Sequence, residues 1–404
     1  RVWHRDGRDL EIAPRGFWPR WSRDGNWIAF TTSDPEGGTG TIHVVRPDGS
    51  DPRELTRTRS QVYGLCWTRD SSRVIFASAQ SGPMSLWSVD IESRVQQSLT
   101  RGPGHSASPT MAPDGQRLVF DFSQRRWYLY LASKPGVEAS LVLTEQGMRG
   151  AAVSPDGSRV AIAFGAESQS PAVSVLDVES QQRHTLSGMA ASAVAWMPDG
   201  QEILVASPAP DGVSQWIWRI SVDGGLPEPI LKGEERWDAP RPSSDGTKIA
   251  AVRVTESGSE LVVHDLVRGA RRTLAHSTVI TAPRWSPDER WLAWSGRWRP
   301  DDLASGGVWV CEVEDCVPRR LTVDGAWPLW DEGGSHLLYA RYIQHDGIWR
   351  VPLAGGSPRL VRRLDDEMED LYLEGLDIGR AGTPLLFFMS KTTSELYVLE
   401  PPIR

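Results

Sequence analysis

Short runs of alternating apolar and polar residues fill the chain and recur with a fixed shape. A polar turn leads directly into an alternating apolar strand, as in residues 21–30, which read Trp-Ser-Arg-Asp-Gly-Asn-Trp-Ile-Ala-Phe. Asp24 can accept hydrogen bonds from backbone N–H groups of the turn, and Gly25 can adopt the positive φ that a side chain would penalise. This stretch therefore predicts a chain reversal followed by a β-strand.

The same turn returns at intervals of 42 to 46 residues. The turn aspartates are Asp24, Asp70, Asp114, Asp156, Asp199, Asp245 and Asp288, and an eroded version lies at Glu332-Gly333-Gly334. Each repeat contains short strands and no helical periodicity, and its fourth strand ends in Leu-Thr or a similar pair. A period of this length filled with four strands is typical of a β-propeller built from four-stranded blades.

The two ends of the chain predict how the ring closes. After Leu360 three more strands are expected, at residues 371–376, 384–389 and 395–399, and no fourth strand follows them. Residues 9–12 read as a fourth strand without a blade of its own. An open seam would leave unpaired strand edges, so we expect the N-terminal strand to join the C-terminal blade.

These features predict an all-β chain that forms one β-propeller. Nine blades of four strands are expected, and eight blades with an irregular closing segment are the alternative. The repeat overrides the two or three domains that a length of 404 residues alone would suggest. The expected single domain spans 1–404, with 1–13 as the closing strand, 14–364 as eight full repeats and 365–404 as a partial closing blade.

Composition places the chain among core-forming globular proteins. Hydrophobic residues make up 39% and charged residues 24% of the sequence, and the formal net charge is −8. The negative balance argues against nucleic acid as an electrostatic partner. No window holds 18 consecutive apolar residues, so no segment is expected to insert into a membrane. Residues 1–4 read as structure rather than as a signal peptide, and the numbering is expected to start inside a longer or processed polypeptide.

The three cysteines predict no disulfide framework. Cys66 lies in an expected inner strand and reads as a small buried apolar residue. Cys311 and Cys316 flank a short connection and could bridge a hairpin in an oxidising compartment, but their spacing alone leaves this open. No cysteine or histidine grouping has the spacing of a zinc site.

Two short motifs recur at fixed places in the repeats. The first is a turn of the W-S-P-D-G type, present at Val153–Gly157 and Trp285–Asp288. The second is a turn ending in Asp-Gly, present at Arg46–Gly49 and Ser221–Gly224. In this order the motifs resemble the WD40-like (PD40) repeats of the TolB-type propellers, and the resemblance covers essentially the whole chain.

The segment Asp346–Gly356 is similar in particular to the C-terminal propellers of bacterial winged-helix regulators and serine/threonine kinases. In those proteins the propeller is a protein-binding or sensory module, in many cases outside the cytoplasm. The resemblance therefore implies a bacterial interaction module with a periplasmic or other extracytoplasmic location. The chain departs from the family pattern at Ser71 and Glu289, which replace the turn glycine, and after Asp331, where the glycine is displaced.

A search for catalytic motifs favours a binding protein over an enzyme. The chain contains no G-x-S-x-G nucleophile elbow, no H-E-x-x-H zinc motif and no G-x-x-x-x-G-K-[ST] phosphate loop. The histidines are His4, His43, His105, His184, His264, His276, His336 and His345, and none forms a close pair. Metal chemistry would need histidines from several blades to converge in the channel. The recurring aspartates are explained by their turns, where a carboxylate caps backbone N–H groups.

Candidate partner-binding residues lie just before the first strand of each repeat, because loops that enter the central channel can vary on a rigid ring. Several are large aromatic or charged residues of the kind that anchor interfaces. They are Phe17, Trp18, Tyr63, His105, Arg149, Trp237, Asp238, Trp327 and Tyr372. The competing interpretation is that Trp18, Trp237 and Trp327 fill gaps between blades.

An acidic run at residues 365–370 lies in the last of these connections. It could recruit a basic partner or help to bind Ca²⁺, whereas a solvated loop is the simpler interpretation. No other cofactor, and no catalytic or metal-binding residue, is predicted.

The leading hypothesis is a non-enzymatic sensory or scaffold propeller. It would bind a protein or peptide at the channel entrance, as a monomer and without nucleic acid. The alternative is a propeller enzyme, a metal-assisted lyase or hydrolase that acts on a carbohydrate or peptide within the channel. A sensor for a small ligand is a third possibility. The sequence does not predict the identity of the partner.

Overall fold

A computed structural model describes most of the chain. The described residues are 2–3, 9–10, 16–33, 39–58, 60–102, 104–133, 139–166, 168, 170–297, 306–341, 347–363, 371–379 and 385–399. Their regular elements are all β-strands, which confirms the predicted all-β character of the chain. Within these residues no helix is long and apolar enough to cross a membrane. The chain divides into two compact units, the first formed by 1–125 and 392–404 and the second by 126–391.

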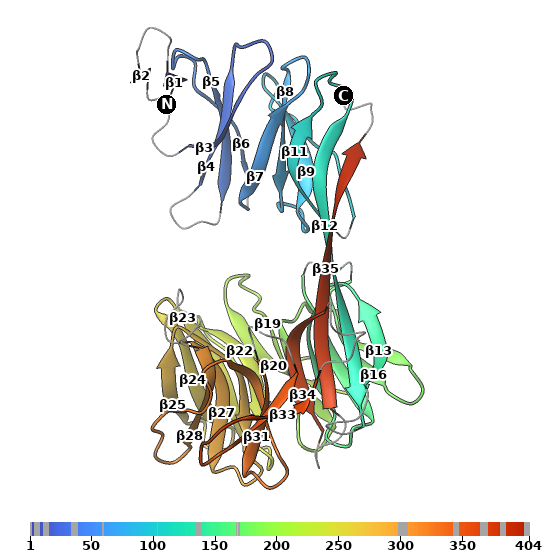
Figure 1. Ribbon diagram of the computed structural model, residues 1–404, viewed down its shortest axis with the longest axis vertical. Helices are drawn as coiled ribbons and strands as arrows, with labels where there is room; N and C mark the ends of the chain where they lie inside the picture. The colour runs from blue at the N-terminus through green and yellow to red at the C-terminus, as the bar shows by residue number, and fades with distance from the viewer. Residues whose placement is uncertain are drawn as a thin grey trace. The chain divides into compact units, whose positions relative to one another are not determined.

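The first unit contains antiparallel sheets from the first three repeats (Figure 1). β3–β6 and β7–β10 each form a four-stranded sheet, β11 pairs with the first part of β12, and β1 pairs with β2. The strands are β1 Val2–Trp3, β2 Asp9–Leu10, β3 Phe17–Trp21, β4 Ile28–Ser33, β5 Gly40–Val45, β6 Arg53–Thr58, β7 Val62–Trp67, β8 Arg73–Ser78, β9 Ser85–Asp90, β10 Gln96–Ser98 and β11 His105–Met111. The strands β12 Leu118–Ala132 and β35 Leu385–Leu399 each cross the boundary between the units.

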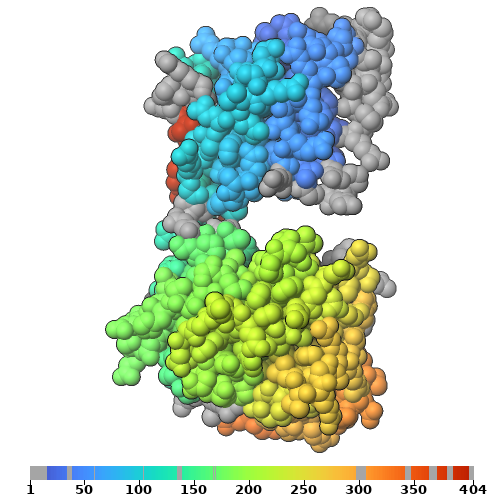
Figure 2. Space-filling view, turned by 180° about the vertical axis from the view of Figure 1, so that it is seen from behind, coloured from blue at the N-terminus to red at the C-terminus, as the bar shows by residue number. Residues whose placement is uncertain are grey.

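The second unit contains five blades of consecutive strands, β14–β17, β18–β21, β22–β25, β26–β29 and β30–β33. Figure 2 shows the surface of this part of the chain, coloured from green through yellow to orange. The strands of the first two of these blades are β14 Met148–Val153, β15 Arg159–Phe164, β16 Val173–Asp177, β17 Arg183–Ser187, β18 Ala193–Trp196, β19 Glu202–Pro208, β20 Gln215–Ser221 and β21 Glu228–Leu231. The next are β22 Arg236–Pro242, β23 Lys248–Thr255, β24 Gly258–Asp265, β25 Arg271–Ser277, β26 Val279–Trp285, β27 Trp291–Arg297, β28 Gly306–Glu312 and β29 Arg319–Arg320. The last are β30 Gly325–Trp330, β31 His336–Arg341, β32 Ile348–Pro352 and β33 Arg359–Arg362.

A sixth blade of this unit combines strands that lie far apart in the sequence. Its order is β34 (Tyr372–Ile378), the first part of β35, the second part of β12 and β13 (Ser140–Glu145). The first strands of the six blades contact one another in a closed cycle, β14 to β18, β22, β26, β30, β34 and back to β14. Within the described residues, the second unit is therefore a closed ring of six four-stranded blades.

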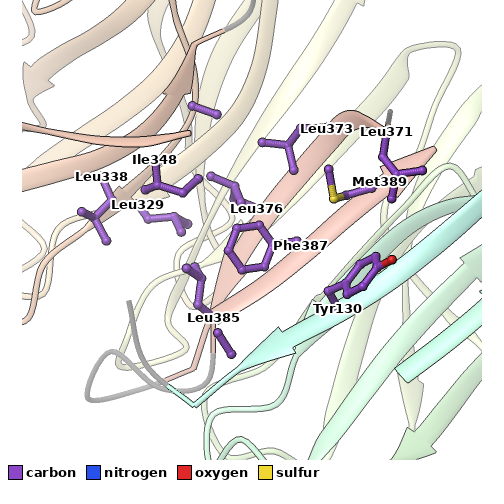
Figure 3. Close-up of a cluster of buried hydrophobic side chains, with 12 residues drawn as sticks. Tyr130, Leu329, Leu338, Ile348, Leu371, Leu373, Leu376, Leu385, Phe387 and Met389 are labelled. Atoms are coloured by element: carbon purple, nitrogen blue, oxygen red, sulfur yellow. The ribbon is translucent and has the colours of Figure 1, made fainter. Parts of the chain in front are cut away.

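Apolar packing seals both faces of the sixth blade. On one face Leu373, Phe387 and Tyr130 join Leu329 and Leu338 of the preceding blade in one buried cluster (Figure 3). On the other face residues of β12 and β35, including Leu129 and Phe388, pack against β14 and β15 of the next blade. Burial of this apolar surface joins the middle and the end of the chain and closes the ring.

The arrangement differs from the predicted single nine-bladed ring. Nine first strands occur within the described residues, but six of them close a ring in the second unit and three belong to the first unit. β2 pairs with β1 rather than with the last blade, whose outer strands come from residues 126–145 instead. The predicted strands at 384–389 and 395–399 form one strand, because Ser390–Ser394 includes no turn-forming Gly, Pro, Asn or Asp.

The turn aspartates do what the sequence predicts. In all seven repeats the Asp Oδ1 accepts a hydrogen bond from the backbone N–H two residues later, at 2.9–3.2 Å. A serine or threonine two residues earlier donates its hydroxyl to the same carboxylate in several turns, as Ser22 Oγ does to Asp24 at 2.6 Å. These bonds lower the pKa of Asp24 to about 2. Ser71 and Glu289 keep the left-handed backbone of the glycines they replace, with φ of 61° and 59°.

Tryptophan side chains tie successive blades together. The indole Nε1–H of Trp196 donates to Ala152 O at 2.9 Å, and Trp285 and Trp330 donate in the same way to Arg241 O and Arg284 O of the blade before. Trp67 makes the equivalent bond to Arg20 O in the first unit. The tryptophan of the W-S-P-D turn therefore connects each of these blades to its predecessor.

We expect Trp196→Phe to lower the free energy of unfolding by about 1–3 kcal/mol, because it leaves the buried Ala152 carbonyl without this donor. Trp218→Phe is the matched control, since Trp218 packs against the same cluster and its Nε1 has no hydrogen-bond partner among the described residues. Urea unfolding of both variants measures the difference. Equal losses for the two variants would show that indole volume, and not the hydrogen bond, carries the effect.

Candidate functional site

The structure brings together some of the predicted partner-binding residues. Arg149, Asp238 and Trp327 line one cavity of about 440 Å³ in the second unit, and every first strand of the ring contributes to its wall. Trp237 is fully buried in a core cluster, so it fills a gap between blades, whereas Tyr372 is 59% exposed and lies outside this wall. Phe17, Trp18, Tyr63 and His105 are exposed residues of the first unit.

The first strands reach this cavity through β-bulges. Five of the six first strands of the ring shift register at this level, and β18 does not. Ala239, Ala282 and Trp327 sit in these bulges with φ of 47°, 51° and 52°. Each is followed by a proline, which has no N–H to lose when the ladder is interrupted. The bulges therefore re-aim the chain toward the channel without leaving backbone donors unpaired at the proline positions.

One position in the second half of each first strand occupies the same register against the second strand, and it follows the bulge where the strand has one. The six residues at this position are Ala152, Ala195, Arg241, Arg284, Leu329 and Asp377. We call this set the channel layer. It contains two guanidinium groups, one carboxylate, two alanines and a leucine.

Arg284 and Asp377 form the central ion pair of the channel layer. Arg284 Nη2 donates to Asp377 Oδ1 at 3.0 Å and to Leu376 O at 2.9 Å, and Nη1 donates to Pro283 O at 3.2 Å. Asp377 Oδ2 accepts from the backbone N–H of Val153 at 2.9 Å. Burial lowers the pKa of Arg284 to about 9, with repulsion from Arg241 adding to this and Asp377 opposing it.

Arg241 is bonded less completely. Its Nη1 donates to Val194 O at 3.1 Å, and its Nη2 lies 3.9 Å from Asp377 Oδ1, beyond hydrogen-bond distance. Its buried Nε has no hydrogen-bond partner among the described residues. Burial lowers the pKa of Arg241, and Asp377 partly offsets this effect.

The two arginines separate two cavities. Both line the 440 Å³ cavity, which we call the bulge-side cavity, and both line a second cavity of about 550 Å³. The second cavity, the turn-side cavity, is bounded by W-S-P-D turn residues such as Pro155 and Pro287. A ligand in either cavity would meet the guanidinium groups at its inner end.

The acids of the bulge-side cavity have partners of their own. Asp238 accepts from Ser192 Oγ at 3.1 Å and from Ala239 N at 2.8 Å, and burial raises its pKa. Asp324 lies 3.3 Å from Arg341 Nε. Glu374 Oε1 accepts from Ser390 Oγ at 2.7 Å.

Sequence reasoning missed Arg241, Arg284 and Asp377, because it looked upstream of the first strands. A signal was present for the arginines. The stretch X-Pro-Arg-X-Ser occurs at residues 18–22, 239–243 and 282–286, and it places an arginine at the same point of three repeats. Asp377 has no such motif and can be found only from its register.

Metal binding has no support in the described ranges. Within them no group of three or more His, Cys, Asp or Glu side chains could hold a metal ion. The acidic run at 365–370, proposed as a Ca²⁺ or basic-partner site, lies outside the described residues.

Comparison with known proteins gives partial matches. No family model matches the chain. Over 299 residues it is 24% identical to dipeptidyl-peptidase 5 of Porphyromonas gingivalis, covering 67% of this chain and 42% of that protein. Over 98 residues it is 29% identical to the Tol-Pal system protein TolB of Desulfotalea psychrophila, covering 24% of this chain and 22% of that protein.

A solved structure gives the fold. The structure of an Agrobacterium tumefaciens protein assigned as TolB covers 67% of this chain and 99% of its own, with 15% identity and a TM-score of 0.52. This likeness shows a TolB-like propeller fold and no more. The chain spans less than half the length of the curated relatives it matches.

We expect Asp377→Ala to lower the free energy of unfolding by about 3–5 kcal/mol, because it leaves the buried Arg284 without its counter-charge. Asp324→Ala is the matched control, since its ion pair at the cavity wall is more exposed and should contribute at most about 1 kcal/mol. Urea unfolding followed by tryptophan fluorescence measures both. A loss for Asp377→Ala no larger than that of the control would contradict a stabilising role for the central ion pair.

Proposed function

We propose that this chain is a non-enzymatic propeller module of a bacterial protein, which binds a segment of a protein or a peptide in the channel of its second unit. The observation that carries the proposal is the bulge-side cavity. All six first strands contribute to its wall, and aromatic, charged and small residues converge there. A rigid ring with variable residues at the channel is suited to recognition.

The size of the site favours a short extended segment over a folded domain. The cavities of about 440 and 550 Å³ fall in the range of pockets that hold small ligands and side chains. Trp327 and Phe388 offer aromatic surface, while Arg149 and Asp238 offer charged groups. A few residues of a peptide would satisfy both kinds of contact.

The module's setting is part of the proposal. The similarity of residues 346–356 to propellers of bacterial winged-helix regulators and kinases supports a sensory role in a longer protein. A disulfide joins Cys311 and Cys316, with their Cα atoms 5.0 Å apart, which supports an oxidising, extracytoplasmic compartment. Free thiols at both positions in protein isolated from its cells would contradict that location.

An enzyme acting in the channel is the second candidate, and the likeness to a dipeptidyl-peptidase is the observation that favours it. Elemental analysis of the purified chain separates the two candidates where the enzyme is metal-assisted. A stoichiometric transition metal would favour the lyase or hydrolase.

Peptide display on the full chain tests binding in the channel. We expect selected peptides to bind Val279→Trp at least about tenfold more weakly than the wild type, because Val279 lines the bulge-side cavity and the indole would narrow it. Val267→Trp is the matched control at an exposed turn, where Val267 is 78% exposed and outside both cavities. Fluorescence anisotropy measures the affinities. Equal binding by the three proteins, or failure to select any peptide, would overturn the proposal.

A further inference from the structure

The channel layer has an unbalanced charge. Arg241 and Arg284 share one carboxylate, and Asp377 is already engaged through Oδ1 by Arg284 and through Oδ2 by Val153 N. Arg284 is buried and Arg241 is largely so, with 20% of its side chain exposed, and an unpaired charge in such surroundings is costly. One positive charge of the layer therefore lacks a counter-ion of its own.

The unmet donors lie together on Arg241. Nε has no hydrogen-bond partner among the described residues, and Nη2 lies 3.9 Å from the nearest carboxylate oxygen that it faces. Nε and Nη2 form one edge of the planar guanidinium, and that edge matches the two oxygens of a carboxylate. A single bound carboxylate would satisfy both donors and balance the charge of the layer.

Most of the other charged groups near the cavities are bonded to partners other than Arg241. Asp238, Asp324 and Glu374 are bonded at the bulge-side wall to Ser192, Arg341 and Ser390. On the turn side, Asp331 accepts from Arg350 Nη2 at 3.0 Å. The remaining charged groups that line the cavities are Arg149 and Glu332.

We propose that the Nε and Nη2 edge of Arg241 binds a carboxylate of the segment that enters the channel. This inference rests on the proposed function and specifies its ligand chemistry. The carboxylate belongs either to a free C-terminus or to an Asp or Glu side chain. Because Arg241 lines both cavities, a segment entering from either side can present the carboxylate to it.

Three small probes separate the two sources in the full chain. They are N-acetyl-Gly-Gly with a free C-terminal carboxylate, the same dipeptide as a C-terminal amide, and N-acetyl-aspartic acid amide. Dissociation constants are measured by tryptophan fluorescence and by thermal shift at equal ionic strength. We expect the acid probes to bind at least about tenfold more tightly than the amide. If only the probe with the free C-terminus binds tightly, the site recognises a terminal carboxylate. If both acid probes bind equally, the site accepts any carboxylate.

Two variants test Arg241 itself. Arg241→Met replaces a buried cation by an apolar side chain of similar length and is expected to fold. Arg241→Lys keeps the charge and loses the two-pronged edge. Both should weaken acid binding at least about tenfold and leave amide binding unchanged. Arg20→Met is the matched control, because Arg20 occupies the same place in an X-Pro-Arg-X-Ser stretch but is exposed in the first unit. It should retain wild-type binding.

A purely structural role for Arg241 would change stability without changing the preference for acids over the amide. The inference is overturned if wild-type protein binds the amide as tightly as the acids, if it binds no acid, or if Arg241→Lys and Arg241→Met keep wild-type affinity. The proposed function can fail separately. Acid probes that bind while display yields no peptide would overturn that function and leave the carboxylate site, whereas channel-binding peptides without any dependence on an acid would do the reverse.

Discussion

Closure of the six-bladed ring depends on one blade that is assembled from two distant parts of the chain. β34 and β35 come from the C-terminal end, and β12 and β13 come from residues 118–145. Their apolar faces fill the space between the fifth blade and β14–β15. Without this blade β14 and β30 would each border an open gap, so the channel exists only because sequence-distant strands pair. Long-range pairing of this kind is entropically expensive to form and is repaid by burial on both faces.

A closed ring turns a repeat position into a layer of six side chains. In three of the six blades the residue at that position is small or apolar, namely Ala152, Ala195 and Leu329. The other three blades place two cations and one anion there, and these side chains are at most 20% exposed. The indole N–H groups of Trp285 and Trp330 donate hydrogen bonds to the backbone carbonyls of Arg241 and Arg284. The two arginines therefore take part both in the contacts between blades and in the charged part of the channel layer. The same local geometry therefore stabilises the ring and positions the charged groups of the site.

Much of the local structure could be predicted from the sequence, because its causes are local. The Asp24 turn and its counterparts require only neighbouring residues, and the strand count follows from alternation. The number of blades in the ring could not be predicted, because each blade contacts only its neighbours and the sequence of one repeat does not determine how many repeats complete a ring. The boundary between the units lies where β12 and β35 continue without a turn. The sequence of residues 390–394 lacks strong turn formers, but this is only a weak sign that the strand continues. Asp377 was missed because its importance comes from register, which a sequence does not display.

The asymmetry between the two arginines is the basis for dividing their roles. Arg284 donates to a carboxylate and to two backbone carbonyls, and its contacts link β26 to β34 across the intervening blade. It therefore acts as part of the scaffold. Arg241 donates to Val194 O of the neighbouring blade but leaves one edge of its guanidinium unbonded. A largely buried cation with hydrogen bonds on one side only gains most from a ligand, because a bound carboxylate would offset the cost of its incomplete solvation.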